Sequence, residues 1–121
     1  MLNEPGDMNR AKPDEPYRLA LQQQITAAAQ ELLKGSISVT EAARRIIGPA
    51  YELGSATDEP FATFLSIDSE TDAFPLGTVR ERWSQSGLQR QDTERAQYEL
   101  AVRDRALEAC REILRRLESA T

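Results

Sequence analysis

An apolar stripe at helical spacing runs through the last third of the chain and constrains its fold more than any other feature. The stripe consists of Tyr98, Val102, Ala106, Ala109, Ile113 and Leu117, with Leu107, Cys110 and Leu114 beside it. Steps of three and four residues put these side chains on one face of an α-helix. Opposite charges recur at the same spacing as Asp92/Arg95, Arg95/Glu99, Glu99/Arg103 and Glu112/Arg116, which supports a solvated opposite face. The sequence therefore predicts a long helix from about residue 86 to 118, with residues 89–97 projecting past the core.

Two further helices are predicted in the first half of the chain. The first begins at Asp14, a good N-cap residue, and ends near Gly35, where a C-terminal cap is expected. The second begins at the capping box Ser38-Val-Thr-Glu41, in which side chains satisfy free amides of the first turn. Gly48-Pro49 then interrupts the pattern, so this helix either stops there or kinks and continues through residue 53.

The middle of the chain, residues 54–77, is the least regular part. It predicts a short helix carrying Phe61 and Phe64, then a loop over residues 66–75. A second capping box at residues 78–81 predicts another short helix, which carries Trp83. Because few strands are plausible, we expect an all-α fold: a small bundle of three to four main helices with an irregular acidic insert and a long C-terminal helix. Residues 1–13 are expected to form a flexible tail, and residues 14–121 a single helical domain.

Two features of the composition limit the chemistry: the 121 residues include no histidine and a single cysteine. Histidine is the commonest general base and the commonest metal ligand. Cys110 lies on the apolar side of the predicted C-terminal helix, so we expect a core residue rather than a nucleophile. No phosphate-binding glycine motif is present. We therefore expect no enzymatic activity and no cofactor; a carboxylate-based enzyme is the least favoured alternative.

The charge and the motifs also argue against several partners. A net charge of −5 disfavours nucleic acid and anionic lipid. Residues 37–46 look like the first helix of a helix-turn-helix, but no basic second helix follows.

The chain starts without a signal-peptide pattern and has no membrane-spanning stretch, so we expect a cytoplasmic protein. The acids of Asp68-Ser-Glu-Thr-Asp72 match the start of a calcium loop, yet Ala73 and Val79 occupy its glycine and glutamate positions. Weak cation binding there stays open.

The charges are distributed unevenly along the chain. Residues 46–79 contain no lysine or arginine and six acids, which gives this segment −6 and the rest of the chain +1. Such a surface attracts a basic partner, although acids in a loop can also serve only to keep it solvated. The aromatic residues of the middle of the chain, Phe61, Phe64, Phe74 and Trp83, are expected mainly to pack this segment onto the bundle, and the alternative is that they serve as an interface anchor. The predicted partner-binding residues are Asp58, Glu59, Asp68, Glu70, Asp72, Phe74 and Trp83.

Two stretches resemble a group of small bacterial helical proteins. They are residues 33–46 (LKGSISVTEAARRI) and 61–77 (FATFLSIDSETDAFPLG), the latter followed by Arg80 and Trp83. The resemblance covers about residues 18–117, and the I-D-S-E-T-D-x-x-P-x-G segment is its specific part. It implies an immunity-type role: a non-catalytic inhibitor that neutralises a cognate toxin through an acidic surface. The alternative is a structural homo-oligomer that assembles through the C-terminal helix.

Overall fold

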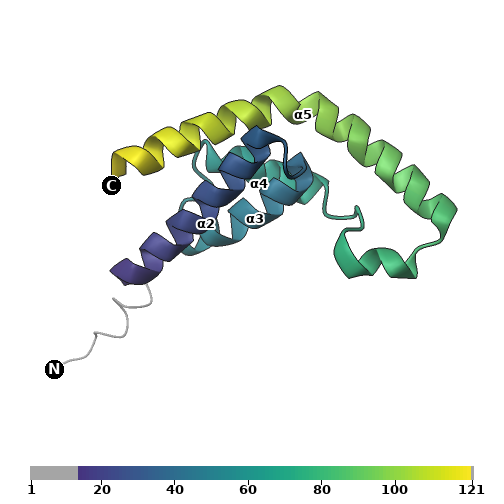
Figure 1. Cartoon of the computed structure of the whole chain (residues 1–121), viewed down its shortest axis with the longest axis horizontal. Coiled ribbons are helices and arrows are strands. Elements are labelled where there is room, and N and C mark those ends of the chain that lie inside the picture. Colours follow the sequence, from purple (N-terminus) through teal and green to yellow (C-terminus); the bar gives the residue numbers. More distant parts are fainter. Residues whose placement is uncertain (1–13, 121) are drawn as a thin grey trace.

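The computed structural model describes residues 14–120, and within them every regular element is helical. In chain order these are α2 (Glu15–Lys34), α3 (Val39–Glu52), α4 (Phe61–Glu70), the 3₁₀ helix η1 (Gly77–Arg82) and α5 (Gln85–Ala120). Figure 1 shows α2, α3 and α4 packed side by side, with the C-terminal part of α5 running along them. The predicted all-α bundle with a long C-terminal helix is confirmed. The predicted N-terminal tail lies outside the described residues.

Local capping signals set the helix ends that the sequence predicted. The Asp14 side chain accepts the Tyr17 N–H at 3.0 Å and starts α2. Gly35 ends α2 with φ +81°, a left-handed conformation that glycine adopts without strain. Ser38 Oγ accepts the Glu41 N–H at 3.0 Å and starts α3. These three contacts satisfy backbone groups that the helices leave free at their ends.

The structure resolves the ambiguity at Pro49 and corrects the predictions for the middle segment. Helix α3 continues through Pro49 to Glu52, and Pro49 itself is buried. The loop predicted over residues 66–75 is wrong in its first half, because α4 extends to Glu70. Ile67 follows Phe64 by three residues and is fully buried beside it, so one more turn of helix completes the apolar face. The element around residues 77–82 is a 3₁₀ helix, and no side chain caps its start.

The core lies between α2, α3, α4 and the C-terminal part of α5. Its largest fully buried apolar side chains are Ile25, Ile46, Phe64, Ile67 and Ile113. Alanines fill many of the remaining core positions, which lets the helix backbones approach closely. Burying each large side chain contributes about 1.5–3 kcal/mol, so this cluster dominates the stability of the bundle.

The N-terminal part of α5 projects beyond the bundle, as the sequence predicted. No side chain of residues 88–101 is fully buried, and Leu100 is 75% exposed. Figure 1 shows this part of α5 extending away from α2–α4, with η1 running back beneath it. Arg80 joins the two, because its guanidinium donates two 2.8 Å hydrogen bonds to the Asp92 carboxylate. We call residues 85–101 the projecting half of α5.

Candidate functional site

The predicted partner-binding acids lie in two groups at opposite ends of α4. Asp58 and Glu59 precede the helix, whereas Asp68, Glu70 and Asp72 lie in its last turn and just beyond. A helix of ten residues is about 15 Å long, so α4 separates the two groups. This separation follows from α4 extending to Glu70, where the sequence predicted a loop.

In the first group, Glu59 lies beside arginines of the C-terminal helix. The Glu59 carboxylate accepts the Thr63 hydroxyl at 3.0 Å, and the Glu59 backbone carbonyl accepts Arg116 Nη1 at 2.8 Å. A shallow groove of about 340 Å³ joins Glu59 to Arg105, Glu108, Glu112 and Arg116 of α5. Both positive and negative side chains line this groove, so the amino end of α4 has a mixed charge.

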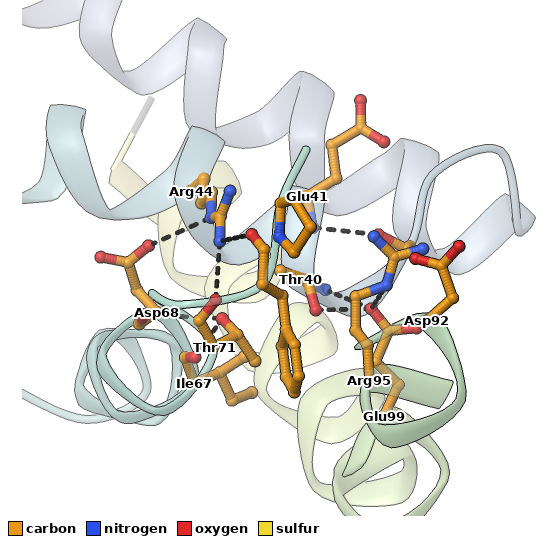
Figure 2. A network of polar contacts seen from close by, with 12 residues as sticks. Thr40, Glu41, Arg44, Ile67, Asp68, Thr71, Asp92, Arg95 and Glu99 are labelled. Carbon is orange, nitrogen blue, oxygen red and sulfur yellow. Dashed lines mark hydrogen bonds and ion pairs between the residues drawn. The ribbon is translucent and has the colours of Figure 1, made fainter. Parts of the chain in front are cut away.

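The second group has one arginine nearby, and that arginine is occupied elsewhere. Arg44 of α3 lies with its Nε 4.0 Å from the Asp68 carboxylate. Its Nη2 donates to the backbone carbonyls of Thr71 at 2.7 Å and Phe74 at 3.2 Å. These carbonyls follow the C-terminal end of α4, where free backbone acceptors and the helix dipole favour a cation. Figure 2 shows Arg44 between Asp68 and Thr71. Arg44 therefore anchors the end of α4 and only weakly compensates Asp68.

The other two carboxylates of this end form no ion pair within residues 14–120. Glu70 accepts a hydrogen bond from the Tyr98 hydroxyl of α5. Burial, together with Glu70, raises the pKa of Tyr98 to about 12, so the phenol remains a neutral donor at physiological pH. Asp72 is exposed, and its side chain forms no hydrogen bond or ion pair with the part of the chain that the structure describes. We call Asp68, Glu70 and Asp72 the acidic end of α4.

The two predicted aromatic anchors differ in exposure. Phe74 is half-buried, and its carbonyl is held by Arg44. Trp83 follows η1 and is 38% exposed. Its ring lies against Gly87, where an added Cβ would come within 3.3 Å of the indole. Trp83 is therefore held in place by the turn into α5 while it still presents apolar surface to solvent.

A further polar contact, between α5 and α3, could not be predicted from the sequence. Glu99 Oε2 accepts the Thr40 N–H at 3.1 Å and the Thr40 hydroxyl at 2.5 Å (Figure 2). Arg95 Nε lies 3.7 Å from the same oxygen, which confirms the predicted Arg95/Glu99 pair. Glu99 thus caps the first turn of α3 from another helix, at the point where the projecting half of α5 leaves the bundle. Thr40 and Glu99 are 59 residues apart, and no sequence pattern links them.

The remaining candidates for chemistry are placed as follows. Cys110 is fully buried, as expected of a core residue, and burial raises the pKa of its thiol to about 12. It is therefore a protonated thiol at neutral pH. Within residues 14–120, no three side chains of the metal-ligating types come close enough to hold a cation together. Over the same residues, no helix has both the length and the apolar character needed to cross a membrane.

Comparison of the chain with protein-family models, with curated proteins and with solved structures found no match. The resemblance of residues 33–46 and 61–77 to small helical bacterial proteins stays a prediction.

Proposed function

We propose that this protein is a non-catalytic binding module that captures a basic protein partner through the acidic end of α4. The observation that supports this proposal is the group of carboxylates at this end of α4 that the fold does not match with an equal number of basic side chains. Among residues 14–120, one arginine lies within ion-pair distance of Asp68, Glu70 or Asp72. This is Arg44, which is 4.0 Å from Asp68 and donates hydrogen bonds to backbone carbonyls. The hydroxyl that holds Glu70 leaves its charge in place.

Uncompensated carboxylates on a folded surface repel one another, and the apolar core does not require them. Their field extends over about 8 Å at physiological ionic strength, and farther in dilute buffer. A charged patch of this kind raises the rate of encounter with an oppositely charged partner by about 10- to 1,000-fold. The acidic end of α4 therefore favours fast capture of a cationic surface.

The partner we propose is a toxin whose own substrate is anionic. Such a toxin needs a cationic active surface, which the carboxylates of Asp68, Glu70 and Asp72 would pair with. Trp83 would supply an apolar anchor of the kind that often dominates binding energy. The block would be steric and electrostatic, and it would require no turnover. The resemblance to immunity-type proteins supports the same role.

A pull-down from native lysate tests the proposal. Asp72→Lys reverses an exposed charge whose side chain forms no hydrogen bond or ion pair with other described residues, so the fold should tolerate it. Glu15→Lys is the matched control, because it changes the net charge equally on an exposed residue, the first of α2. We expect the wild type and Glu15→Lys to retain the same basic protein, and Asp72→Lys to retain much less of it.

Association kinetics with the captured protein provide the second measurement. Neutralising the acidic end with Asp68→Asn, Glu70→Gln and Asp72→Asn should slow association and reduce its dependence on salt. The dissociation rate should change less, because steering acts mainly on encounter. Association rates and salt dependence equal to those of the wild type would rule out this surface.

A further inference from the structure

Four exposed charges lie along α5: Arg90 and Glu94 in its projecting half, and Arg105 and Glu108 in the part that packs on the bundle. Arg90, Glu94 and Arg105 are exposed and form no ion pair or hydrogen bond within residues 14–120. Glu108 is exposed and pairs only with Arg111, one turn along the same helix, at 3.2 Å. With 3.6 residues per turn, all four charges lie along one flank of α5.

The order of these charges is self-complementary. Along the chain they read positive, negative, positive, negative, as Arg90, Glu94, Arg105 and Glu108. If the α5 helices of two copies lie side by side and antiparallel, Arg90 of one copy faces Glu108 of the other, and Glu94 faces Arg105. Two-fold symmetry repeats each contact. In a parallel, in-register pair, each charge would instead lie beside the identical charge of the second copy and repel it.

The same antiparallel register also covers apolar surface. Thr93 and Leu100 are exposed next to the charged flank of α5, and Leu107, seven residues after Leu100, is partly buried against the edge of the core. In the register set by the charges, Leu100 lies beside Leu100 of the second copy, and Thr93 lies beside Leu107. Leu100 is 75% exposed and Leu107 is partly buried, so both can lose further surface on association.

We infer that two copies of this chain associate through antiparallel pairing of their α5 helices. The projecting half of each copy then lies along the bundled part of the other copy's α5. Arg90 of one copy reaches the groove that holds Glu108 and Glu59 of the other. Pairing also gives the projecting half a packing partner, which a short, polar stretch of helix needs because it is marginally stable in water alone. This inference does not rest on the proposed function, because the acidic end of α4 takes no part in it.

Two single charge reversals and their mixture test the pairing. In Glu94→Arg, the new arginine faces Arg105 of the second copy, and in Arg105→Glu the new glutamate faces Glu94. Symmetry turns two attractive contacts into two repulsive ones in each variant. We expect each variant alone to associate at least about tenfold more weakly than the wild type in analytical ultracentrifugation. Both sites are exposed, so helicity measured by circular dichroism should not change.

Two further experiments test whether association depends on this specific pairing of charges: a mixture of the two single variants, and a double variant. In an equimolar mixture of the two variants, every facing pair is again attractive, so we expect mixed dimers. The double variant Glu94→Arg/Arg105→Glu should also regain self-association. A wild type that stays monomeric at all concentrations, single variants that associate like the wild type, or a mixture that stays monomeric would each overturn the inference. Capture of a basic partner through Asp72 should be the same in all these variants, so the two proposals fail independently.

Discussion

Removing the Glu99 carboxylate should destabilise the bundle at the junction of α5 and α3. Glu99 Oε2 accepts both the N–H and the hydroxyl of Thr40, and Thr40 is completely buried. A hydrogen bond to a charged acceptor contributes about 1.5–3 kcal/mol, and an unsatisfied buried polar group costs about 1–3 kcal/mol. In Glu99→Ala the amide and the hydroxyl of Thr40 both lose this acceptor. We expect the free energy of unfolding to fall by about 2–4 kcal/mol.

A double-mutant cycle measures the contact itself. Glu99→Gln keeps an acceptor without the charge and should lose about half as much stability as Glu99→Ala. Thr40→Val removes the hydroxyl and preserves the shape of the side chain. Its loss of unfolding free energy should therefore not add fully to that of Glu99→Ala, because both variants remove the same hydrogen bond. We expect a coupling energy of about 1–2 kcal/mol between the two sites from urea unfolding, within the range seen for residues in contact.

The control for this cycle is Glu81→Ala, an exposed position in η1 that is not part of the proposed pairing surface and has no partner among the described residues. Its effect on stability should stay within about 0.5 kcal/mol, as is usual for surface substitutions. Additive effects of Thr40→Val and Glu99→Ala, or a loss for Glu99→Ala no larger than that for Glu81→Ala, would refute the reasoning. The carboxylate would then be a surface charge and not a cap.

Two further predictions concern the end of α4. Arg44→Met removes the hydrogen bonds to the carbonyls of Thr71 and Phe74, so hydrogen exchange of residues 70–76 should accelerate more than that of α2; uniform acceleration would contradict a local anchor. Tyr98 should ionise near pH 12 when its absorbance is followed at alkaline pH, and Glu70→Gln should lower that value. Because folding raises the pKa of Tyr98 above its value in the unfolded chain, this contribution to stability is complete below about pH 10 and is lost as pH rises toward 12. A titration of Tyr98 at pH 10 would contradict the burial and the contact with Glu70.

Local signals in the sequence predict the helix ends, whereas contacts between distant segments decide the site. Asp14, Gly35 and Ser38 act through backbone groups a few residues away, so their roles as caps can be predicted from the residues next to them in the sequence. The last turn of α4 is different. Its residues 66–70 are mostly polar, and the turn is held by burial of Ile67 and by Arg44, which reaches it from α3. The contact of Arg44 leaves no pattern in the sequence, and the single step of three residues from Phe64 to Ile67 is too short to predict a helix through the polar residues around Ile67.

The same difference explains how the predicted acidic surface changed. The charge of residues 46–79 was evident from composition, but its distribution depends on α4 being a helix through Glu70. That helix places Glu59 beside a groove lined by Arg105 and Arg116 of α5, and among the described residues it leaves one arginine within ion-pair distance of the acidic end of α4. Composition could give the net charge of the segment, whereas the fold decides which acids share a surface with arginines.

The position of the Glu99 cap connects the two surfaces. It fixes α5 to the start of α3 where the projecting half begins, and Tyr98, the preceding residue, holds Glu70 of the acidic end. A change that loosens α5 at this junction therefore moves both the charged flank of α5 proposed to pair with a second copy and Tyr98, which binds Glu70 of the acidic end. Variants at Glu94 or Arg105 change the flank alone, and Asp72→Lys changes the acidic end alone. Glu99→Ala should weaken dimerisation and partner capture together, which is the result expected if a single rigid helix positions both surfaces.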